Sequence, residues 1–222
     1  MALIAGVDEA GRGPCLGPLV VAGVVIDEKL EEDLIRMGIT DSKLIAPKKR
    51  EQLFDIIKEK VKDYKIIVIS PEEIDEAVNS KTTNLNWLEA THYAIATNYL
   101  KPDTIIVDCP STNIEAFTEY FKKLLIDDIR DKVNIKCEHK ADLNYPVAGA
   151  ASILAKVTRD REIEKLKQKY GNIGSGYPAD PTTQKFLAEN YEKLKDAGIF
   201  RKSWACYKKL VKGKNQKSLG EF

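Results

Sequence analysis

The segment "GVDEAGRGP", residues 6–14, ends an apolar run on two adjacent carboxylates and follows them with a glycine-flanked arginine. Residues 2–7, "ALIAGV", carry no charge, which is typical of a strand that is buried on both faces. Asp8 and Glu9 close this run, and the turn Gly11-Arg12-Gly13 comes next. Ligand sites of open α/β sheets form outside the carboxyl ends of their strands. The segment therefore predicts a functional site where the first strand ends.

Four further apolar runs predict a five-stranded mixed sheet flanked by helices, an α/β fold. The second run, residues 18–26, follows the first after a short glycine and proline connection that suits an antiparallel pair. The third run, residues 65–70, is expected to continue an antiparallel meander with the first two. The last two runs, residues 104–108 and 133–137, alternate with helical segments, as strands do in right-handed parallel crossover units.

The chain beyond the last expected strand is predicted to be helical. Glycine and proline in "GNIGSGYPADP", residues 171–181, interrupt the helical pattern there. We therefore expect three parts along the chain. They are an α/β domain at residues 1–178, a helical appendage at 179–215 and a tail at 216–222.

Two more aspartates are expected at the same edge of the sheet as Asp8. "TIIV" stops at Asp108, and parallel neighbouring strands would place the two residues roughly 5 Å apart at the backbone. Asp142 follows the fifth strand. Taken singly, Asp108 could cap a turn and Asp142 could open a helix. Together with Asp8 they predict an acidic cluster, whose mutual repulsion a divalent cation would relieve.

A cluster that offers only carboxylate oxygens favours Mg²⁺ or Mn²⁺ over zinc. Two such cations about 4 Å apart are the usual apparatus of phosphodiester hydrolysis. Glu9 can join the cluster only if the strand ends or bends after Asp8, because consecutive strand residues point to opposite faces. We expect such a bend, which the sequence Ala10-Gly11 would permit.

The composition is that of a globular protein, with 43% apolar residues and a formal net charge of +1. The four cysteines form no CxxC pair, which disfavours a zinc cluster or a disulfide framework. The start has no basic leader and no apolar stretch is long enough to cross a bilayer, so we expect a cytoplasmic protein. Residues 200–217 carry lysines and arginine but no acid, which fits either a phosphate-binding surface or a solvated helix face.

The glycines at residues 11–17 do not match a dinucleotide-binding motif. Their spacing is GxGxxxG, Pro14 interrupts it, and a strand follows where a helix should begin. Two acids also precede the glycines, where a pyrophosphate would have to lie. The alternative use of these glycines is a close approach of the backbone to a ligand.

Several motifs, in order from residue 2 to about residue 180, resemble type 2 ribonuclease H, ribonuclease HII, and its archaeal branch in particular. They are "DEAGRGP", "DSK" at 41–43, "IIVD" at 105–108, "HKAD" followed by "YPVAGAASILAKVTRDREI" at 139–163, and "GSGY" at 174–177. The resemblance implies a ribonuclease H-like fold and a metal-dependent endonuclease of DNA replication and ribonucleotide excision repair. Such an enzyme hydrolyses the RNA strand of RNA/DNA hybrids and nicks duplex DNA 5′ of embedded ribonucleotides, leaving 3′-hydroxyl and 5′-phosphate ends.

The resemblance also implies roles for individual residues of a monomeric enzyme. The family's four metal-binding and catalytic acids, which hold two Mg²⁺ or Mn²⁺ ions during turnover, match Asp8, Glu9, Asp108 and Asp142. The turn whose backbone reads the ribose 2′-hydroxyl matches Gly11, Arg12 and Gly13. The tyrosine that stacks on the sugar at the RNA to DNA junction matches Tyr177, and Ser42 and Lys43 resemble phosphate contacts.

The last seven residues, "QKSLGEF", place Gln216, Leu219 and Phe222 at Q-x-x-L-x-x-F spacing. Leucine and phenylalanine three residues apart share one face of a helical turn. The pattern resembles the sliding-clamp-binding peptide at the C-terminus of many replication and repair proteins, although the usual second aromatic is missing. A chance match at a frayed terminus is the alternative.

Two other classes of function stay open on the residues alone. One is a different nuclease of the same fold superfamily, such as a DNA junction resolvase. The other is a non-catalytic module that binds nucleic acid or a clamp. Cleavage of a duplex with a single ribonucleotide separates these hypotheses.

Overall fold

The computed structural model describes residues 2–39 and 45–217, with side chains as far as residue 213. The chain forms two compact units. We call the first the sheet unit; it comprises Met1–Ala10, Val20–Val68 and Leu85–Thr158. We call the second the helical unit; it comprises Gly11–Leu19, Ile69–Asn84 and Arg159–Phe222.

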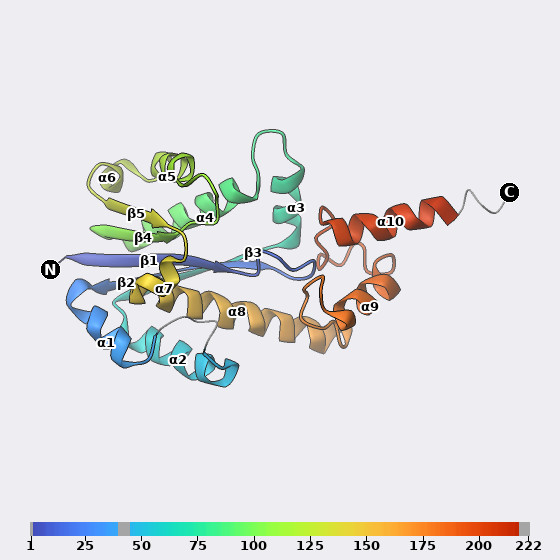
Figure 1. The fold of residues 1–222 in the computed structure, drawn as a ribbon, viewed down its shortest axis with the longest axis horizontal. Coiled ribbons are helices and arrows are strands. Elements are labelled where there is room, and N and C mark those ends of the chain that lie inside the picture. The colour runs from blue at the N-terminus through green and yellow to red at the C-terminus, as the bar shows by residue number, and fades with distance from the viewer. Residues whose placement is uncertain (1, 40–44, 218–222) are drawn as a thin grey trace. The chain divides into compact units, whose positions relative to one another are not determined.

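The sheet unit is built on a five-stranded mixed sheet in the order β3-β2-β1-β4-β5 (Figure 1). Strand β1 pairs antiparallel with β2 and parallel with β4, and β4 pairs parallel with β5. These pairings confirm the predicted antiparallel pairing of the first two strands and the predicted parallel strands, and β3 lies beside β2 as the expected meander requires. The strands are β1 (Leu3–Ala10), β2 (Leu19–Asp27), β3 (Asp63–Ile69), β4 (Thr104–Asp108) and β5 (Asn134–Glu138).

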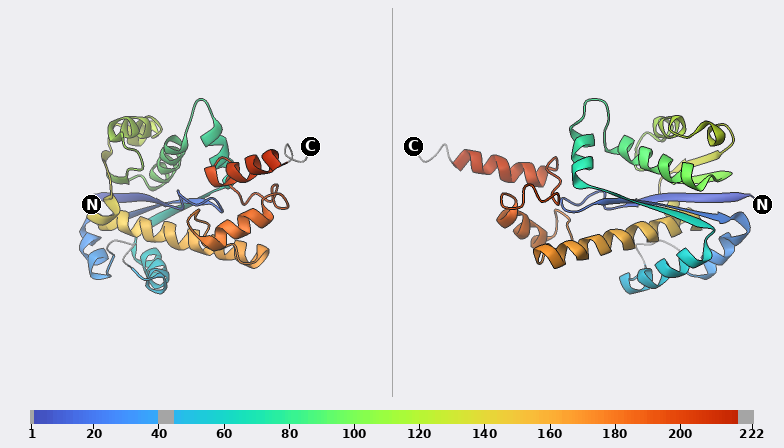
Figure 2. Two further views of the ribbon diagram at one scale, coloured as in Figure 1. Left: turned by 45° about the vertical axis from the view of Figure 1, so that its right-hand side comes forward. Right: turned by 180° about the vertical axis from the view of Figure 1, so that it is seen from behind.

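Helices cover both faces of this sheet (Figure 2). On one face lie α4 (Leu85–Leu100), α5 (Ile114–Lys123) and α6 (Asp127–Arg130). On the other lie α1 (Glu31–Arg36), α2 (Pro47–Lys60) and the first part of α8 (Pro146–Tyr170). The remaining short elements are the 3₁₀ helix η1 (Glu28–Leu30) and α7 (Ala141–Asn144).

The close approach of α8 to β1 explains a glycine in the first strand. A Cβ atom added to Gly6 would lie 2.4 Å from the backbone nitrogen of Ala148, so only glycine fits there. The surrounding core contains Val24, Ile106 and Leu154, all fully buried. Apolar burial on both faces is what makes β1 read as a continuous apolar run in the sequence.

The helical unit contains the end of α8 together with α3 (Pro71–Asn79), α9 (Pro181–Asn190) and α10 (Ala205–Lys217). Residues 11–19 belong to this unit: Leu16 forms an isolated β-bridge with Phe200, and Cys15 N donates to the Gly176 carbonyl at 2.8 Å. The predicted domain boundary after residue 178 falls inside this unit and, as a statement about independently folding parts, stays a prediction.

The expected bend after Asp8 is wrong. Strand β1 continues through Ala10, and its register with β2 runs on without a bulge, pairing Glu9 with Val21 and Ala10 with Val20. Regular pairing of this kind keeps alternate side chains on opposite faces of the sheet.

Within residues 2–39 and 45–217, no helix combines the length and apolar character needed to cross a membrane.

Candidate metal centre

The register of β1 and β4 brings Asp8 and Asp108 together. Val7 pairs with Val107 in the parallel ladder, and each aspartate follows one residue later. Asp142 lies on α7, which begins two residues after His139 and shortly after β5 ends. Each of the three aspartates offers a carboxylate oxygen, and these oxygens all lie within 4.8 Å of one another. The structure therefore assembles three of the four predicted acids into one cluster.

The loop between β5 and α7 fixes the third acid. Lys140 adopts a left-handed conformation, with φ of 59°, and so turns the chain sharply into α7. Ala141 N then donates to Asp108 Oδ1 at 3.0 Å. This contact ties the start of α7 to the end of β4, and thereby sets Asp142 beside Asp108.

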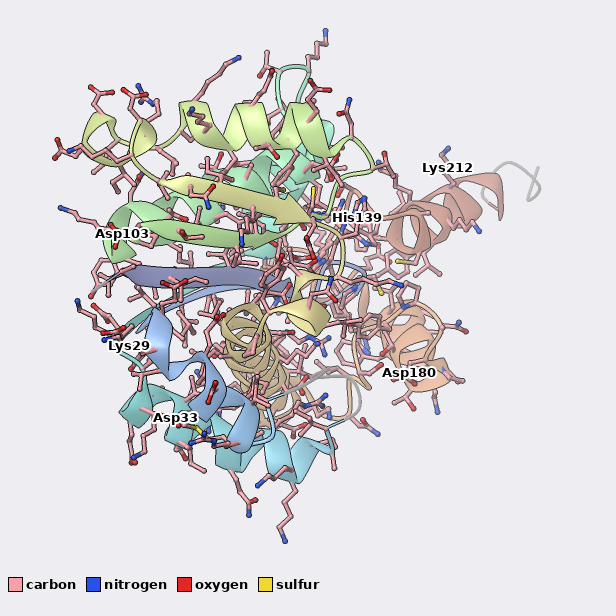
Figure 3. All side chains as sticks on the ribbon, turned by 60° about the vertical axis from the view of Figure 1, so that its left-hand side comes forward. Lys29, Asp33, Asp103, His139, Asp180 and Lys212 are labelled. Atoms are coloured by element: carbon pink, nitrogen blue, oxygen red, sulfur yellow. The ribbon has the colours of Figure 1, made fainter. Side chains whose placement is uncertain are left out.

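The cluster lies at the carboxyl ends of the parallel strands. Figure 3 labels Asp103, just before β4, and His139, just after β5, at opposite ends of these two strands. His139 Nδ1 lies 3.1 Å from the carbonyl oxygen of Cys109. The histidine is absent from the metal-ligating group that the described residues form.

Burial makes the negative charges of this cluster costly. Asp8 is 4% exposed, and burial raises its pKa well above the usual value, helped by the charges of Glu9 and Asp108. Burial also raises the pKa of Asp108, and the charge of Asp142 adds to that effect. A cation among these oxygens would remove both the repulsion and much of the desolvation cost.

The donor set fits a hard divalent cation. Asp142 is 4% exposed, and its Oδ1 atom is buried without a hydrogen-bond partner in the described part of the chain. A buried carboxylate oxygen in that condition is costly unless something binds it. The three clustered ligands are all carboxylates, which is the chemistry of Mg²⁺ and Mn²⁺ sites.

Glu9 faces the opposite side of the sheet from Asp8. Its carboxylate accepts a hydrogen bond from the hydroxyl of Tyr93, a fully buried residue of α4. Asp8 instead lies near Ser152 and Lys156 of α8, which covers the other face. Glu9 is therefore outside the group formed by the three aspartates, and its role as a metal ligand stays a prediction.

Sequence reasoning missed the two α8 side chains beside Asp8. Lys156 Nζ donates to Ser152 Oγ at 3.0 Å, and both groups lower the pKa of Asp8, by charge and by hydrogen bonding respectively. A signal for them exists, because a serine and a lysine four residues apart share one face of a helix that is otherwise apolar there. Lys156 supplies a positive charge at the edge of the cluster.

The glycine-arginine turn and Tyr177 both belong to the helical unit, and the structure brings them together there. Gly11 has φ of 91°, a conformation that favours glycine. A Cβ added to Gly13 would lie 3.5 Å from the Tyr177 ring. The ring is 43% exposed and the Arg159 guanidinium lies 5.2 Å from its centre. The Tyr177 ring therefore has a free surface beside the turn.

Other predicted site residues fall outside what the structure describes. Ser42 and Lys43, the expected phosphate contacts, lie outside the described residues. Leu219 and Phe222 of the expected clamp-binding tail do so as well. Gln216 lies within α10, but its side chain is not described.

Comparison with known proteins identifies the family. Residues 5–207 match the family model of ribonuclease HII. The chain belongs to the ribonuclease HII family. The ribonuclease HII of Pyrococcus furiosus is 46% identical over 226 residues, covering 99% of this chain and 97% of that protein. The ribonuclease HII of Methanococcus maripaludis strain C6 is 46% identical over 215 residues, covering 95% and 87% respectively.

Solved structures agree with this assignment. The ribonuclease H2 of Pyrococcus horikoshii OT3 matches with a TM-score of 0.84 at 45% identity, covering 94% of this chain and 96% of that one. Ribonuclease HII in a complex with PCNA from Archaeoglobus fulgidus matches with a TM-score of 0.79 at 36% identity, covering 90% and 92%. As a member of the ribonuclease HII family, this protein is a metal-dependent endoribonuclease that acts on RNA/DNA hybrids.

Proposed function

We propose that this member of the ribonuclease HII family hydrolyses the RNA strand of hybrids and also nicks duplex DNA on the 5′ side of a single embedded ribonucleotide, leaving 3′-hydroxyl and 5′-phosphate ends. The observation that carries the proposal is the trio of Asp8, Asp108 and Asp142, of which the first and last are buried and whose carboxylate oxygens lie within 4.8 Å of one another. Excision of ribonucleotides from replicated DNA is the cellular role that this activity would serve.

Asp8, Asp108 and Asp142 would hold the metal. When bound, Mg²⁺ or Mn²⁺, two ions per active site, would supply activation of a water and stabilisation of the leaving oxygen. The Ala141 amide would orient Asp108 for this task by donating to its Oδ1 atom. Lys156 lies beside Asp8 and limits the excess negative charge of the site before substrate phosphate arrives.

Glu9 would be the fourth acid of the site. In the structure it accepts the Tyr93 hydroxyl on the opposite face of the sheet. Its participation therefore requires that the carboxylate exchange this tyrosine for the metal, with a local change of β1 near Ala10. The exchange is favourable only when the interaction of the Glu9 carboxylate with a cation is stronger than its buried hydrogen bond.

The helical unit would supply recognition of the ribose. The backbone of Gly11, Arg12 and Gly13 would contact the 2′-hydroxyl, the one group that distinguishes a ribonucleotide from a deoxyribonucleotide at that position. The exposed ring of Tyr177 would stack on the sugar at the RNA to DNA junction. Ser42 and Lys43 would contact phosphates of the duplex.

A test of this function uses a DNA duplex with one ribonucleotide, incubated with Mg²⁺ or Mn²⁺. We expect a single nick 5′ of the ribonucleotide and no cleavage of the all-DNA duplex. Cleavage of branched all-DNA substrates would instead indicate a junction resolvase, and binding without cleavage would indicate a non-catalytic module. The end groups are checked by ligation and by phosphatase treatment.

A sliding clamp is the proposed protein partner. The related Archaeoglobus fulgidus structure contains ribonuclease HII in a complex with PCNA. In this chain Gln216, Leu219 and Phe222 have the spacing of a clamp-binding peptide. We propose that this tail recruits the enzyme, as a monomer, to a clamp loaded on replicated DNA.

A further inference from the structure

Arg201 is a fully buried arginine that binds three backbone carbonyls of the segment at residues 11–17. Its Nη2 donates to the Gly11 carbonyl at 2.6 Å and its Nη1 to the Arg12 carbonyl at 2.9 Å. Its Nε donates to the Gly17 carbonyl at 3.0 Å. Arg201 is 0% exposed, so it belongs neither to a solvated helix face nor to a phosphate-binding surface, the two interpretations open for the basic segment 200–217.

The chemistry of this contact is specific to arginine. Three carbonyls in different directions match the planar fork of donors in a guanidinium, which the single ammonium of lysine cannot reproduce. Burial and the charge of Arg159 lower the pKa of Arg201 to about 10, which still leaves it protonated at neutral pH. A buried cation of this kind is stabilised by the carbonyl dipoles that it binds.

Trp204 holds the next carbonyl of the same turn. Its Nε1 donates to the Gly13 carbonyl at 3.3 Å, and its ring lies 5.1 Å from the Arg201 guanidinium. Arg201 and Trp204 thus donate hydrogen bonds to the carbonyls of three consecutive residues, Gly11 to Gly13. A cation-π contact joins the two side chains that do so.

Asp75 of α3 fixes the segment that carries both side chains. Its carboxylate accepts Lys202 N at 2.7 Å, Ser203 N at 2.8 Å and Ser203 Oγ at 2.5 Å. These residues stand between Arg201 and Trp204 in the chain. The side chain of Asp75 therefore fixes the conformation of residues 201–204, and these residues fix the turn at residues 11–13.

Holding the carbonyls sets the direction of the amides. In a trans peptide the carbonyl of one residue and the N–H of the next point to opposite sides of the chain. The described residues contain no cis peptide bond. Contacts of Arg201 with the Gly11 and Arg12 carbonyls therefore direct the Arg12 and Gly13 N–H groups away from Arg201, toward the other side of the turn.

We propose that Arg201 and Trp204, ordered by Asp75, are positioning residues that set the discrimination between ribose and deoxyribose. They would do so by holding the carbonyl side of the turn, so that the opposite side stays arranged for the 2′-hydroxyl. The proposal rests on the proposed function, in which the backbone of this turn reads that hydroxyl. None of the three side chains would touch the reacting atoms.

The test measures the binding preference rather than the rate. The dissociation constants of a duplex with one ribonucleotide and of its all-DNA counterpart are compared by fluorescence anisotropy in EDTA, where no cleavage occurs. Arg201→Lys keeps the charge but loses the fork, and we expect the preference for the ribonucleotide to fall about tenfold. Trp204→Phe keeps an aromatic ring but loses the indole N–H, and Asp75→Asn keeps the side-chain shape but loses the carboxylate. Each should lower the preference for the ribonucleotide several-fold.

Lys202→Ala is the matched control, because it removes an exposed neighbouring charge without a side-chain contact to the turn. Lys202→Ala should weaken binding of both duplexes equally and leave the preference for the ribonucleotide unchanged. A folded Arg201→Lys variant with an unchanged preference would overturn the proposal. If that variant unfolds, unchanged preferences in both Trp204→Phe and Asp75→Asn overturn it instead. Absence of any preference in the wild-type protein would overturn the proposed 2′-hydroxyl reading itself.

Discussion

Asp8 and Glu9 are consecutive in the sequence but face opposite sides of the sheet. Asp8 lies with Asp108 and Asp142, whereas Glu9 accepts a hydrogen bond from Tyr93 of α4. The regular pairing of β1 through Ala10 causes this separation. Three acids are consequently assembled before any cation arrives, and Glu9 lies apart from them.

Asp8→Asn and Asp108→Asn should each lower cleavage of a hybrid by at least about 100-fold, because each removes a charged metal ligand. Both should remain folded. The raised pKa of each acid means that its ionised form costs stability above the usual pKa, so at pH 7 in EDTA the midpoint of thermal unfolding should stay level or rise.

Metal binding gives a second measure of the same variants. Mg²⁺ or Mn²⁺ should raise the unfolding midpoint of the wild-type protein, because the ion binds the folded state, and should raise it much less in the variants. Asp128→Asn, at an exposed acid of α6, is the control and should behave as wild type. Substantial turnover by either variant would refute the role of that acid.

Glu9→Gln should lower hybrid cleavage strongly, whereas Tyr93→Phe should preserve most of it. The tyrosine substitution removes the hydroxyl that holds Glu9 and therefore eases transfer of the carboxylate toward the metal. The dependence of cleavage on Mn²⁺ concentration measures this, and Tyr93→Phe should not need more metal than wild type. Wild-type activity in Glu9→Gln would remove Glu9 from the mechanism.

Asp180→Asn should destabilise the helical unit at neutral pH. Asp180, labelled in Figure 3, accepts hydrogen bonds from Ser175 N at 2.6 Å and Thr182 N at 2.9 Å, and these bonds hold its pKa well below the usual range. An acid with a lowered pKa stabilises the fold above its unfolded pKa of about 4, and this contribution is lost as the pH falls through the folded value.

Urea unfolding of Asp180→Asn and wild type at a series of pH values checks this sign. The difference between the two proteins should be full at pH 7 and should shrink progressively below about pH 4. Asp131→Asn, at an exposed acid, is the control. Equal stability of wild type and Asp180→Asn at pH 7 would contradict the assignment.

Deletion of residues 216–222 should abolish binding to a sliding clamp while leaving hybrid cleavage intact. The physical reason is that Leu219 and Phe222 would supply the apolar face that enters the clamp's pocket. Surface plasmon resonance with immobilised clamp measures the first property, and cleavage without clamp measures the second. The double substitution Leu219→Ala and Phe222→Ala is the finer variant, and unchanged clamp affinity in either would disprove the role of the tail.

Much of the fold and part of the site follow from local sequence patterns. The apolar run "TIIVD" predicted β4 at residues 104–108, where the structure has it. The ends of such runs also predicted that Asp8, Asp108 and Asp142 converge, because parallel buried strands present their carboxyl ends at one edge. The bend after Asp8 was predicted wrongly, since glycine permits a bend but strand pairing decides whether one forms.

By itself, the sequence determined the α/β class, the edge of the sheet that carries the acids and the type of cation that they suit. These properties depend on periodicity and residue chemistry, which are local. Only the tertiary structure decided that Glu9 faces Tyr93 and that Arg201 is buried against the turn at residues 11–13. Contacts between residues 190 positions apart depend on how distant segments pack. A basic stretch has the same sequence pattern whether its arginine faces water or backbone carbonyls.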